Sequence, residues 1–259
     1  MYKQKKIIST LVIIAILGLA VALSGCEEEK IENKIIVGTS ADFPPFEYVE
    51  DSKIVGFDIE MVTMILENLN YTVEIQDIAF EGLIAALKTD KIDVIAAGMS
   101  IDPEREVDFT IPYYEADLSV LVLTESNYTI NETNYLTVLA NLTIGAQTAT
   151  TGADWIYETF INITNATMQE DQFKRYTTYT LAVLDLTNKN LDAVVIDKPV
   201  AEAFAEDGDK EVAYIIDSDE EYGLAVKEGN TELLEQLNQG LLDLMGTEDW
   251  TNLVKKYFE

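Results

Sequence analysis

The sequence predicts an α/β fold in two lobes, with parallel strands covered by helices. The first observation is a repeated change of period: short β-branched runs alternate with segments whose apolar residues recur every three or four positions. Such alternation is typical of parallel sheets with helices on both faces. The second observation is a break in this rhythm around Ile111–Tyr114, after which the alternation resumes. The break indicates two lobes, although periodicity does not locate their junction.

The elements before the break follow from these periods. Phe57, Met61, Met64, Ile65 and Leu69 share one helix face. The remaining elements expected here are strands at Ile35–Val37, Tyr71–Ile75 and Ile92–Ala97 and a short helix at Leu83–Lys88.

The elements after the break are predicted in the same way. The strands are expected at Leu118–Leu123, Leu142–Ala146, Ala193–Ile196 and Tyr222–Val226, and the helices at Gly152–Phe160, Tyr179–Leu186, Pro199–Phe204, Thr231–Met245 and Glu248–Phe258. Thr124–Asn134 is expected to be a polar loop, and the acidic segment Asp217–Glu221 a turn.

The N-terminal segment has the pattern of an export signal. Three lysines precede an apolar run over Ile7–Leu23, and small residues then lead to Cys26, the only cysteine of the chain. The segment resembles a bacterial-type lipobox, which predicts a signal peptide over residues 1–25, lipidation of Cys26 and a tether over residues 26–33. An uncleaved anchor is an alternative, because the run approaches the roughly 20 residues that span a bilayer. A cleaved, unlipidated protein is another, and all three place the chain outside the cytoplasm.

The composition excludes several classes of function. With 47 acidic and 17 basic residues, the chain has a net charge of −30, so nucleic acid is not an expected partner. The acids are spread along the chain, which is typical of a solvated surface. Because there is no histidine, histidine-based catalysis and histidine metal sites are excluded. We expect neither a metal nor a cofactor.

Asn-x-Thr tripeptides recur along the chain. They begin at Asn70, Asn127, Asn131, Asn141, Asn162 and Asn165. On an exported chain these are possible glycan acceptors, and an Asn- and Thr-rich composition in a cell without glycosylation is the alternative.

Five motifs resemble those of the polar amino acid binding proteins of ABC importers, the extracellular solute-binding proteins of family 3. Gly56–Glu60 resembles their VGFD signature, and the others, in family order, are Asp42–Glu47, Met99–Arg105, Gln147–Gly152 and Asp192–Asp197. The resemblance covers about residues 34–258. It implies the type II periplasmic-binding-protein fold, with lobe 1 over residues 34–117 and 219–259, lobe 2 over residues 118–218, and a hinge of two crossing segments near Ala116–Ser119 and Asp217–Tyr222.

The resemblance also implies a function and a site. The protein would be a monomer anchored by lipid at the outer face of the cytoplasmic membrane, periplasmic or extracellular, which delivers an amino acid to an ABC importer permease. Its ligand-binding residues would be Phe43, Phe80, Gly98, Ser100, Arg105, Gln147, Thr151, Gly152 and Asp197.

These residue types suit a free amino acid, which has two charges that need partners when buried. Arg105 can hold the carboxylate with a bidentate fork, and Thr151 and Gly152 lie at an expected helix start that favours an anion. Asp197 can accept the ammonium, helped by the carbonyl of Gly98. Ser100 can add hydroxyl and amide bonds, while Phe43 and Phe80 would enclose the ligand side chain.

Each residue also has a structural alternative. Arg105 could bridge to Asp102 or Asp108 at the surface, and Asp197 could cap the helix at Pro199. Phe43 and Phe80 could be ordinary core residues, and Thr150 and Thr151 could only cap a helix.

Two positions depart from the family pattern. Ala149 replaces a glycine, which puts a positive φ there in doubt. Ser40 stands where binders of basic amino acids often have an aspartate, although Glu47 or Gln147 could substitute. With no extra cation in the set, we expect a polar or basic ligand.

The rival functions are a dehydratase on the same scaffold, with Glu47 as proton donor, and a sensor component that presents its ligand to a receptor.

Overall fold

The computed structural model describes residues 33–164 and 166–259, and residues from Lys34 onward form one compact unit. The expected signal peptide, Cys26 and Asn165 lie outside the described residues. Within those two ranges, no helix has the length and apolar character that crossing a membrane requires.

The first sheet has five strands in the order β5-β1-β6-β13-β7. The strands are β1 (Lys34–Thr39), β5 (Thr72–Asp77), β6 (Val94–Ile95), β7 (Asp108–Phe109) and β13 (Ala225–Val226). β1 pairs in parallel with β5 and β6, and β13 is inserted between β6 and β7 in antiparallel pairing. The strands at the centre of this sheet therefore come from opposite ends of the chain.

Helices cover both faces of the first sheet. One face packs on α2 (Phe57–Asn68), α8 (Thr231–Leu244) and α9 (Glu248–Phe258), and the other on α3 (Phe80–Lys88). The predicted helix face is confirmed, since Met61 and Ile65 are buried in the same cluster as Leu237 and Leu241 of α8. The 3₁₀ turn η1 (Pro103–Arg105) follows the end of β6 and carries Arg105.

The second sheet has the order β10-β9-β11-β8-β12. Its strands are β8 (Tyr114–Leu123), β9 (Ile144–Gln147), β10 (Phe173–Tyr176), β11 (Ala193–Asp197) and β12 (Lys210–Tyr222). Its helices are α4 (Tyr135–Leu139), α5 (Thr151–Ile156), the π-helical η3 (Tyr157–Ile161), α6 (Tyr179–Thr187) and α7 (Lys198–Ala205), with 3₁₀ turns η2 (Thr124–Ser126) and η4 (Glu170–Gln172).

Alternation along β11 explains why helices cover both faces of this sheet. Ala193 and Val195 pack with α5, whereas Val194 and Ile196 belong to the cluster that includes α6 and α7. Successive side chains of a strand point to opposite faces. A continuous apolar run is therefore what a strand buried on both sides requires.

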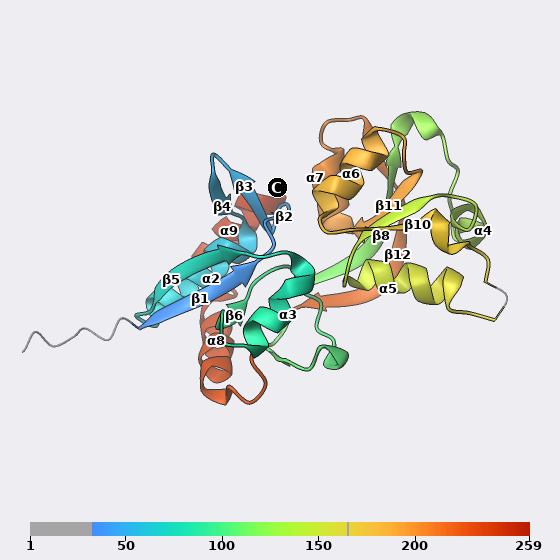
Figure 1. The fold of residues 1–259 in the computed structure, drawn as a ribbon. Helices are drawn as coiled ribbons and strands as arrows, with labels where there is room; N and C mark the ends of the chain where they lie inside the picture. The colour runs from blue at the N-terminus through green and yellow to red at the C-terminus, as the bar shows by residue number, and fades with distance from the viewer. Residues whose placement is uncertain (1–32, 165) are drawn as a thin grey trace, which may run out of the picture. The chain divides into compact units, whose positions relative to one another are not determined.

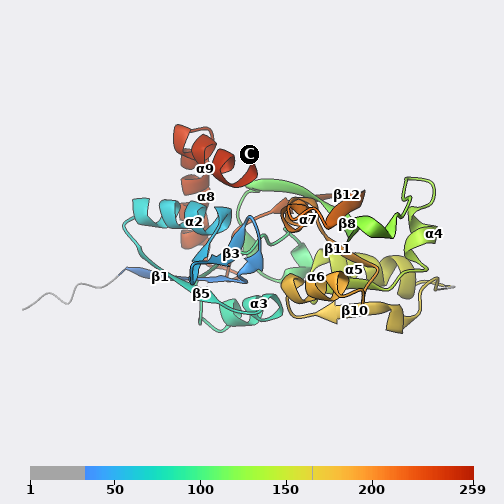
Figure 2. The same ribbon diagram turned by 90° about the horizontal axis from the view of Figure 1, so that it is seen from above.

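Two long strands link the two sheets, and both views show them running from one lobe into the other (Figures 1 and 2). β8 and β12 are antiparallel over their whole length, from Lys210 opposite Leu123 to Tyr222 opposite Tyr114. Ser100, after β6, bridges to Tyr222 and so connects this pair with the first sheet. The chain thus has two α/β lobes joined by two crossing strands.

The expected turn at Asp217–Glu221 is wrong. These residues continue β12, where Glu220 and Glu221 pair with Ala116 and Glu115 of β8. A register shift between Ile216 and Glu220 absorbs the irregular segment. Long-range pairing therefore overrides the local turn preference of this acidic stretch.

Several short elements are absent from the sequence prediction. They are β10, α4, the first half of β12 and a small sheet of β2 (Asp42–Phe43), β3 (Glu47–Glu50) and β4 (Lys53–Val55). The small sheet follows β1 and carries Phe43 on β2 and Glu47 on β3. Immediately after it, Gly56 adopts φ 136°, and a Cβ atom there would lie 2.1 Å from the carbonyl oxygen of Phe46.

We predict that Gly56→Ala destabilises the protein more than a glycine-to-alanine substitution at a site where the unfavourable φ is the only cost. The clash with backbone adds to the unfavourable φ, so the free energy of unfolding should fall by about 3 kcal/mol. Gly229 is the matched control, because its φ is 83° and a Cβ would meet nothing within 4 Å; Gly229→Ala should cost about 1 kcal/mol. Chemical denaturation measures both, and equal losses would contradict the role given to Gly56.

Candidate ligand-binding site

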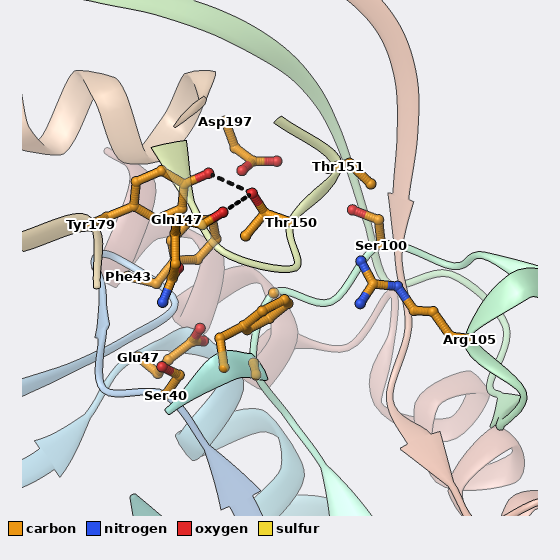
Figure 3. Close-up of a pocket in the computed structure, with 13 residues that line it drawn as sticks. Ser40, Phe43, Glu47, Ser100, Arg105, Gln147, Thr150, Thr151, Tyr179 and Asp197 are labelled. Atoms are coloured by element: carbon orange, nitrogen blue, oxygen red, sulfur yellow. Dashed lines mark hydrogen bonds between the residues drawn. The ribbon is translucent and has the colours of Figure 1, made fainter. Parts of the chain in front are cut away.

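A pocket with an empty volume of about 320 Å³ lies between elements of the two lobes. The first lobe contributes the loops after β1 and β6, the small sheet, the start of α3 and the end of η1. The second lobe contributes the end of β9 and the starts of α5, α6 and α7 (Figure 3). Its walls are Ser40, Phe43, Glu47, Phe80, Ala97, Gly98, Ser100, Arg105, Gln147, Thr150, Thr151, Tyr179 and Asp197.

Arg105 provides a partly buried cation, and the acids Asp102, Asp154 and Glu220 interact with it electrostatically. Among residues 33–164 and 166–259 no carboxylate forms an ion pair with it, and its buried Nε has no hydrogen-bond partner. The guanidinium lies 5.7 Å from the ring centroid of Phe80, and burial lowers its pKa. The alternative of a surface bridge is wrong, since Asp102 and Asp108 instead accept from backbone N–H groups.

The start of α5 separates two threonines that the sequence left equivalent. Thr150 is the N-cap, and its hydroxyl accepts from Ala153 N at 3.2 Å. Thr151 does not cap; its hydroxyl donates to Glu220 at 2.8 Å. Ala149 does adopt a positive φ, 64°, so the missing glycine does not prevent this loop conformation.

Asp197 points its carboxylate into the site rather than at the helix that follows. It occupies the N-cap position of α7 but makes no side-chain capping bond, so the capping alternative is wrong. Its Oδ1 accepts from Tyr222 Oη at 2.6 Å. Burial, and then the charge of Glu220, raise the pKa of Asp197 to about 7. A cationic ligand group would stabilise its ionised form.

Two aromatic residues line the pocket although they are buried. Phe43 and Phe80 are 7% and 8% exposed, so both belong to the core and also line the pocket wall. Phe43 stacks on Tyr179 of the other lobe with ring centroids 5.6 Å apart. Gly98, at φ 50°, makes this possible, because a Cβ there would lie 2.7 Å from Phe43.

Asp58 of the VGFD motif supports the site from behind. Its Oδ2 accepts from Gly98 N at 2.9 Å and from Tyr113 Oη at 2.5 Å. Burial raises the pKa of Asp58 to about 7. Asp58 therefore fixes the backbone N–H of Gly98, a residue of the pocket wall.

Glu47 is the most unusual group of the pocket. It is fully buried, and neither carboxylate oxygen has a hydrogen-bond partner in the described part of the chain. Burial first, and then the charge of Asp58, raise the pKa of Glu47 well above its usual value. Ser40 donates its hydroxyl to Asp42 at 2.9 Å. Glu47 and Ser40 lie side by side in the pocket (Figure 3).

Eight of the nine residues expected to bind a ligand lie together in the pocket wall. Gln147 is among them and donates Nε2 to the carbonyl of Thr177 at 3.0 Å. Gly152 is not in the wall; it packs α5 on β11, where a Cβ would lie 3.3 Å from Val195 O. The ligand contacts themselves stay a prediction.

Sequence reasoning missed Tyr179, Tyr222 and Glu220. Tyr179 stacks on Phe43 and Tyr222 binds Asp197, while Glu220 accepts from Ser100 and Thr151. Each interaction joins segments far apart in the chain. No local pattern of residue types marks them.

Comparisons with known proteins agree with this architecture. A curated relative, the arginine-binding extracellular protein ArtP of Bacillus subtilis, is 30% identical over 240 residues, 91% of this chain and 89% of that protein. The ABC transporter arginine-binding protein 1 of Escherichia coli is 30% identical over 234 residues, 87% of this chain and 90% of that protein.

Solved structures match over nearly the same extent. A mutant of ArgBP from T. maritima superposes with a TM-score of 0.80 at 34% identity, over 90% of this chain and 98% of that one. An ancestral arginine-binding protein bound to arginine gives 0.79 at 33% identity, over 88% and 99%. The family model for bacterial extracellular solute-binding proteins, family 3, matches residues 35–259. The chain therefore belongs to the bacterial extracellular solute-binding proteins of family 3, which bind solutes and are not enzymes.

Proposed function

We propose that the protein captures a free basic amino acid, arginine in the first place, outside the cell and delivers it to an ABC importer. The observation that carries the proposal is Glu47, a fully buried carboxylate with no partner in a pocket that also contains Asp197. An ionised carboxylate in such a place is costly unless a cation joins it. Two acids and one arginine complement a ligand with two positive charges and one negative charge.

Each ligand group has a candidate partner. Arg105 offers its fork to the α-carboxylate, and the free N–H groups at the start of α5 add to it. Asp197 and the carbonyl of Gly98 accept the α-ammonium. Phe43 and Phe80 enclose the methylenes of the side chain, and Glu47 accepts its cationic end. Gly152 contributes only through its backbone in this assignment.

The energies are adequate for a useful affinity. Hydrogen bonds to charged groups contribute about 1.5–3 kcal/mol each. Several of these, less the entropic cost of association, leave the roughly 8 kcal/mol of a micromolar site. The comparisons support the ligand class, because the relatives reported above bear the names of arginine-binding proteins.

Closure of the lobes would trap the ligand. We place lobe 1 at residues 34–117 and 219–259 and lobe 2 at residues 118–218, in keeping with the register in which Leu118 pairs with Asp197 and Tyr222 with Tyr114. Because ligand contacts come from both sides, bound amino acid favours the closed state by population shift.

The location follows from the family and the N-terminal pattern together. The family is extracellular, and the lipobox-like segment ending at Cys26 supports a lipid anchor on the outer face of the cytoplasmic membrane. We also propose that the protein acts as a monomer, with the importer permease as its partner.

A thermal-shift screen of the full chain against the twenty amino acids tests the function. A ligand bound only by the native state raises the melting temperature, by about 5 °C or more at a hundred times Kd. Arginine should give the largest rise, and lysine and histidine smaller ones. No rise with any amino acid, in a folded and ligand-free sample, would contradict the proposal.

The role of Glu47 gives a sharper prediction. Glu47→Gln should weaken arginine binding by about 2–5 kcal/mol, since it removes one member of a buried charge pair. Binding of glutamine, which has no side-chain charge, should change little. Glu50→Gln is the matched control, because Glu50 lies on the same strand but is exposed. Isothermal calorimetry measures all three proteins, and an unchanged arginine affinity in Glu47→Gln would remove Glu47 from the site.

A further inference from the structure

Glu220 joins the two halves of the pocket from outside its wall. It lies on β12 opposite Ala116 of β8, is 8% exposed and does not line the pocket. Its Oε2 accepts a hydrogen bond from Thr151 Oγ1 at 2.8 Å and another from Ser100 Oγ. One carboxylate oxygen of a crossing strand therefore holds two hydroxyl groups.

The two donors belong to different lobes. Ser100 follows β6 of the first sheet, and Thr151 opens α5 after β9 of the second. Figure 3 shows their side chains facing each other beside the guanidinium of Arg105. Two hydroxyl groups can converge on one oxygen only when the lobes have this separation. The pair of bonds is therefore specific to the arrangement in which the pocket is formed.

The charge of Glu220 is compensated on the same side. Burial raises the pKa of Glu220, whereas the bonds from Ser100 and Thr151 and the charge of Arg105 oppose this rise. Asp197 and Asp117 are the acids that face it from β11 and β8. Arg105 therefore interacts electrostatically with Glu220 and also lines the pocket.

We propose that Glu220 is a positioning residue that latches the pocket in its closed arrangement. It orients Ser100 and Thr151 beside Arg105 and slows the escape of the bound amino acid. This inference rests on the proposed function for its ligand, but the latch itself exists without ligand. The effect of the latch on ligand release and its effect on the ligand-free protein can therefore be measured separately.

The first measurement is the kinetics of arginine binding to the full chain by stopped flow. Glu220→Ala should raise the dissociation rate about tenfold and leave the association rate within about twofold. Glu220→Gln should dissociate at close to the rate of the unchanged protein, because its amide oxygen can still accept hydrogen bonds from both hydroxyl groups. Glu221→Gln is the matched control, since Glu221 is the next residue of β12 and is exposed; it should behave as the unchanged protein. A Glu220→Ala protein that dissociates like the control would overturn the latch.

The second measurement needs no ligand. Hydrogen exchange followed by mass spectrometry should be faster in ligand-free Glu220→Ala at peptides that contain Ser100 and Thr151. Exchange in α8 should not change, which separates a lost latch from unfolding. Exchange at both peptides equal to that of the control overturns the latch, whether or not arginine binds. Failure of the unchanged protein to bind any amino acid overturns the proposed function alone.

All five Asn-x-Thr tripeptides that the structure describes have an exposed asparagine, namely Asn70, Asn127, Asn131, Asn141 and Asn162. None of these asparagines lines the pocket. Four of them lie in the second lobe near η2, α4 and η3, and both views place α4 at the end of that lobe that faces away from the first sheet (Figures 1 and 2).

The hydrogen bonds within its own tripeptide favour Asn131 as a glycan acceptor. Its Oδ1 accepts from Thr133 N at 3.0 Å and from Thr133 Oγ1 at 2.6 Å. The hydroxyl of the third residue thus contacts the acceptor amide, while the exposed amide nitrogen is left available. Threonine, rather than serine, occupies this third position in all six tripeptides.

We infer that the far end of the second lobe is N-glycosylated, first at Asn131. The donor would be a lipid-linked oligosaccharide phosphate, used by a membrane transferase. The amide nitrogen of Asn131 bonds to the anomeric carbon, the bond from that carbon to the phosphate oxygen breaks, the lipid phosphate leaves and the amide proton is lost. No oxidant or reductant is involved.

Glycopeptide mass spectrometry on the full chain from the membranes of its native host tests this. Peptides with Asn131, Asn127 or Asn141 should carry an added saccharide mass, and Thr133→Ala and Asn131→Gln should each remove it at Asn131. Asn188 and Asn190, which are exposed but outside any such tripeptide, serve as controls. Unmodified peptides at all these positions, or equal modification of the controls, would overturn the inference.

Discussion

The antiparallel pairing of β8 with β12 is the constraint on which the site depends. It fixes Tyr222 where its hydroxyl reaches Asp197, and it fixes Glu220 between Ser100 and Thr151. The bridge from Ser100 to Tyr222 ties the same pair to the first sheet. A change in this register would displace groups on both sides of the pocket at once. The geometry of the site is therefore a property of the crossing strands more than of either lobe alone.

The pocket contains buried ionisable groups whose polar atoms are not all hydrogen-bonded. Both carboxylate oxygens of Glu47 and the Nε of Arg105 lack hydrogen-bond partners in the described part of the chain, which is costly in a buried place. The backbone around them is correspondingly constrained, since Asp58 holds Gly98 and the two-residue strand β2 holds Phe43. A ligand with complementary charges would supply the missing partners. Binding strength is in this sense built into the fold before the ligand arrives.

Much of the fold could be predicted from sequence because long elements have strong periods. The strand at Ala193–Ile196 and the helix face of Met61 and Ile65 are local patterns with one structural solution. The turn expected at Asp217–Glu221 was wrong because its strand is imposed by β8, about a hundred residues earlier in the chain. Short strands such as β2 and β10 have too few residues for a period to appear.

The pocket residues that belong to family motifs could be predicted from the sequence. Those that reach the pocket only through tertiary contacts could not. Arg105 and Asp197 are single residues in recurrent motifs, and the structure places both in the pocket wall. Gly152 belongs to the same kind of motif, but its side of the helix start packs on β11. Tyr179 and Glu220 reach the site only because folding brings distant segments of the chain together. The importance of Glu47 follows from its burial without a partner, which no sequence pattern reports.

The strand order of the first sheet has a consequence for how the chain folds. β13, near the C-terminus, lies between β6 and β7 and completes this sheet. The segment from β8 to β12 is instead continuous and contains all five strands of the second sheet. During synthesis or export, the second lobe can therefore assemble while the first still lacks an interior strand. Contacts of such large sequence separation form slowly, so closure of the first sheet should be the late step of folding, and the binding pocket should be its last product.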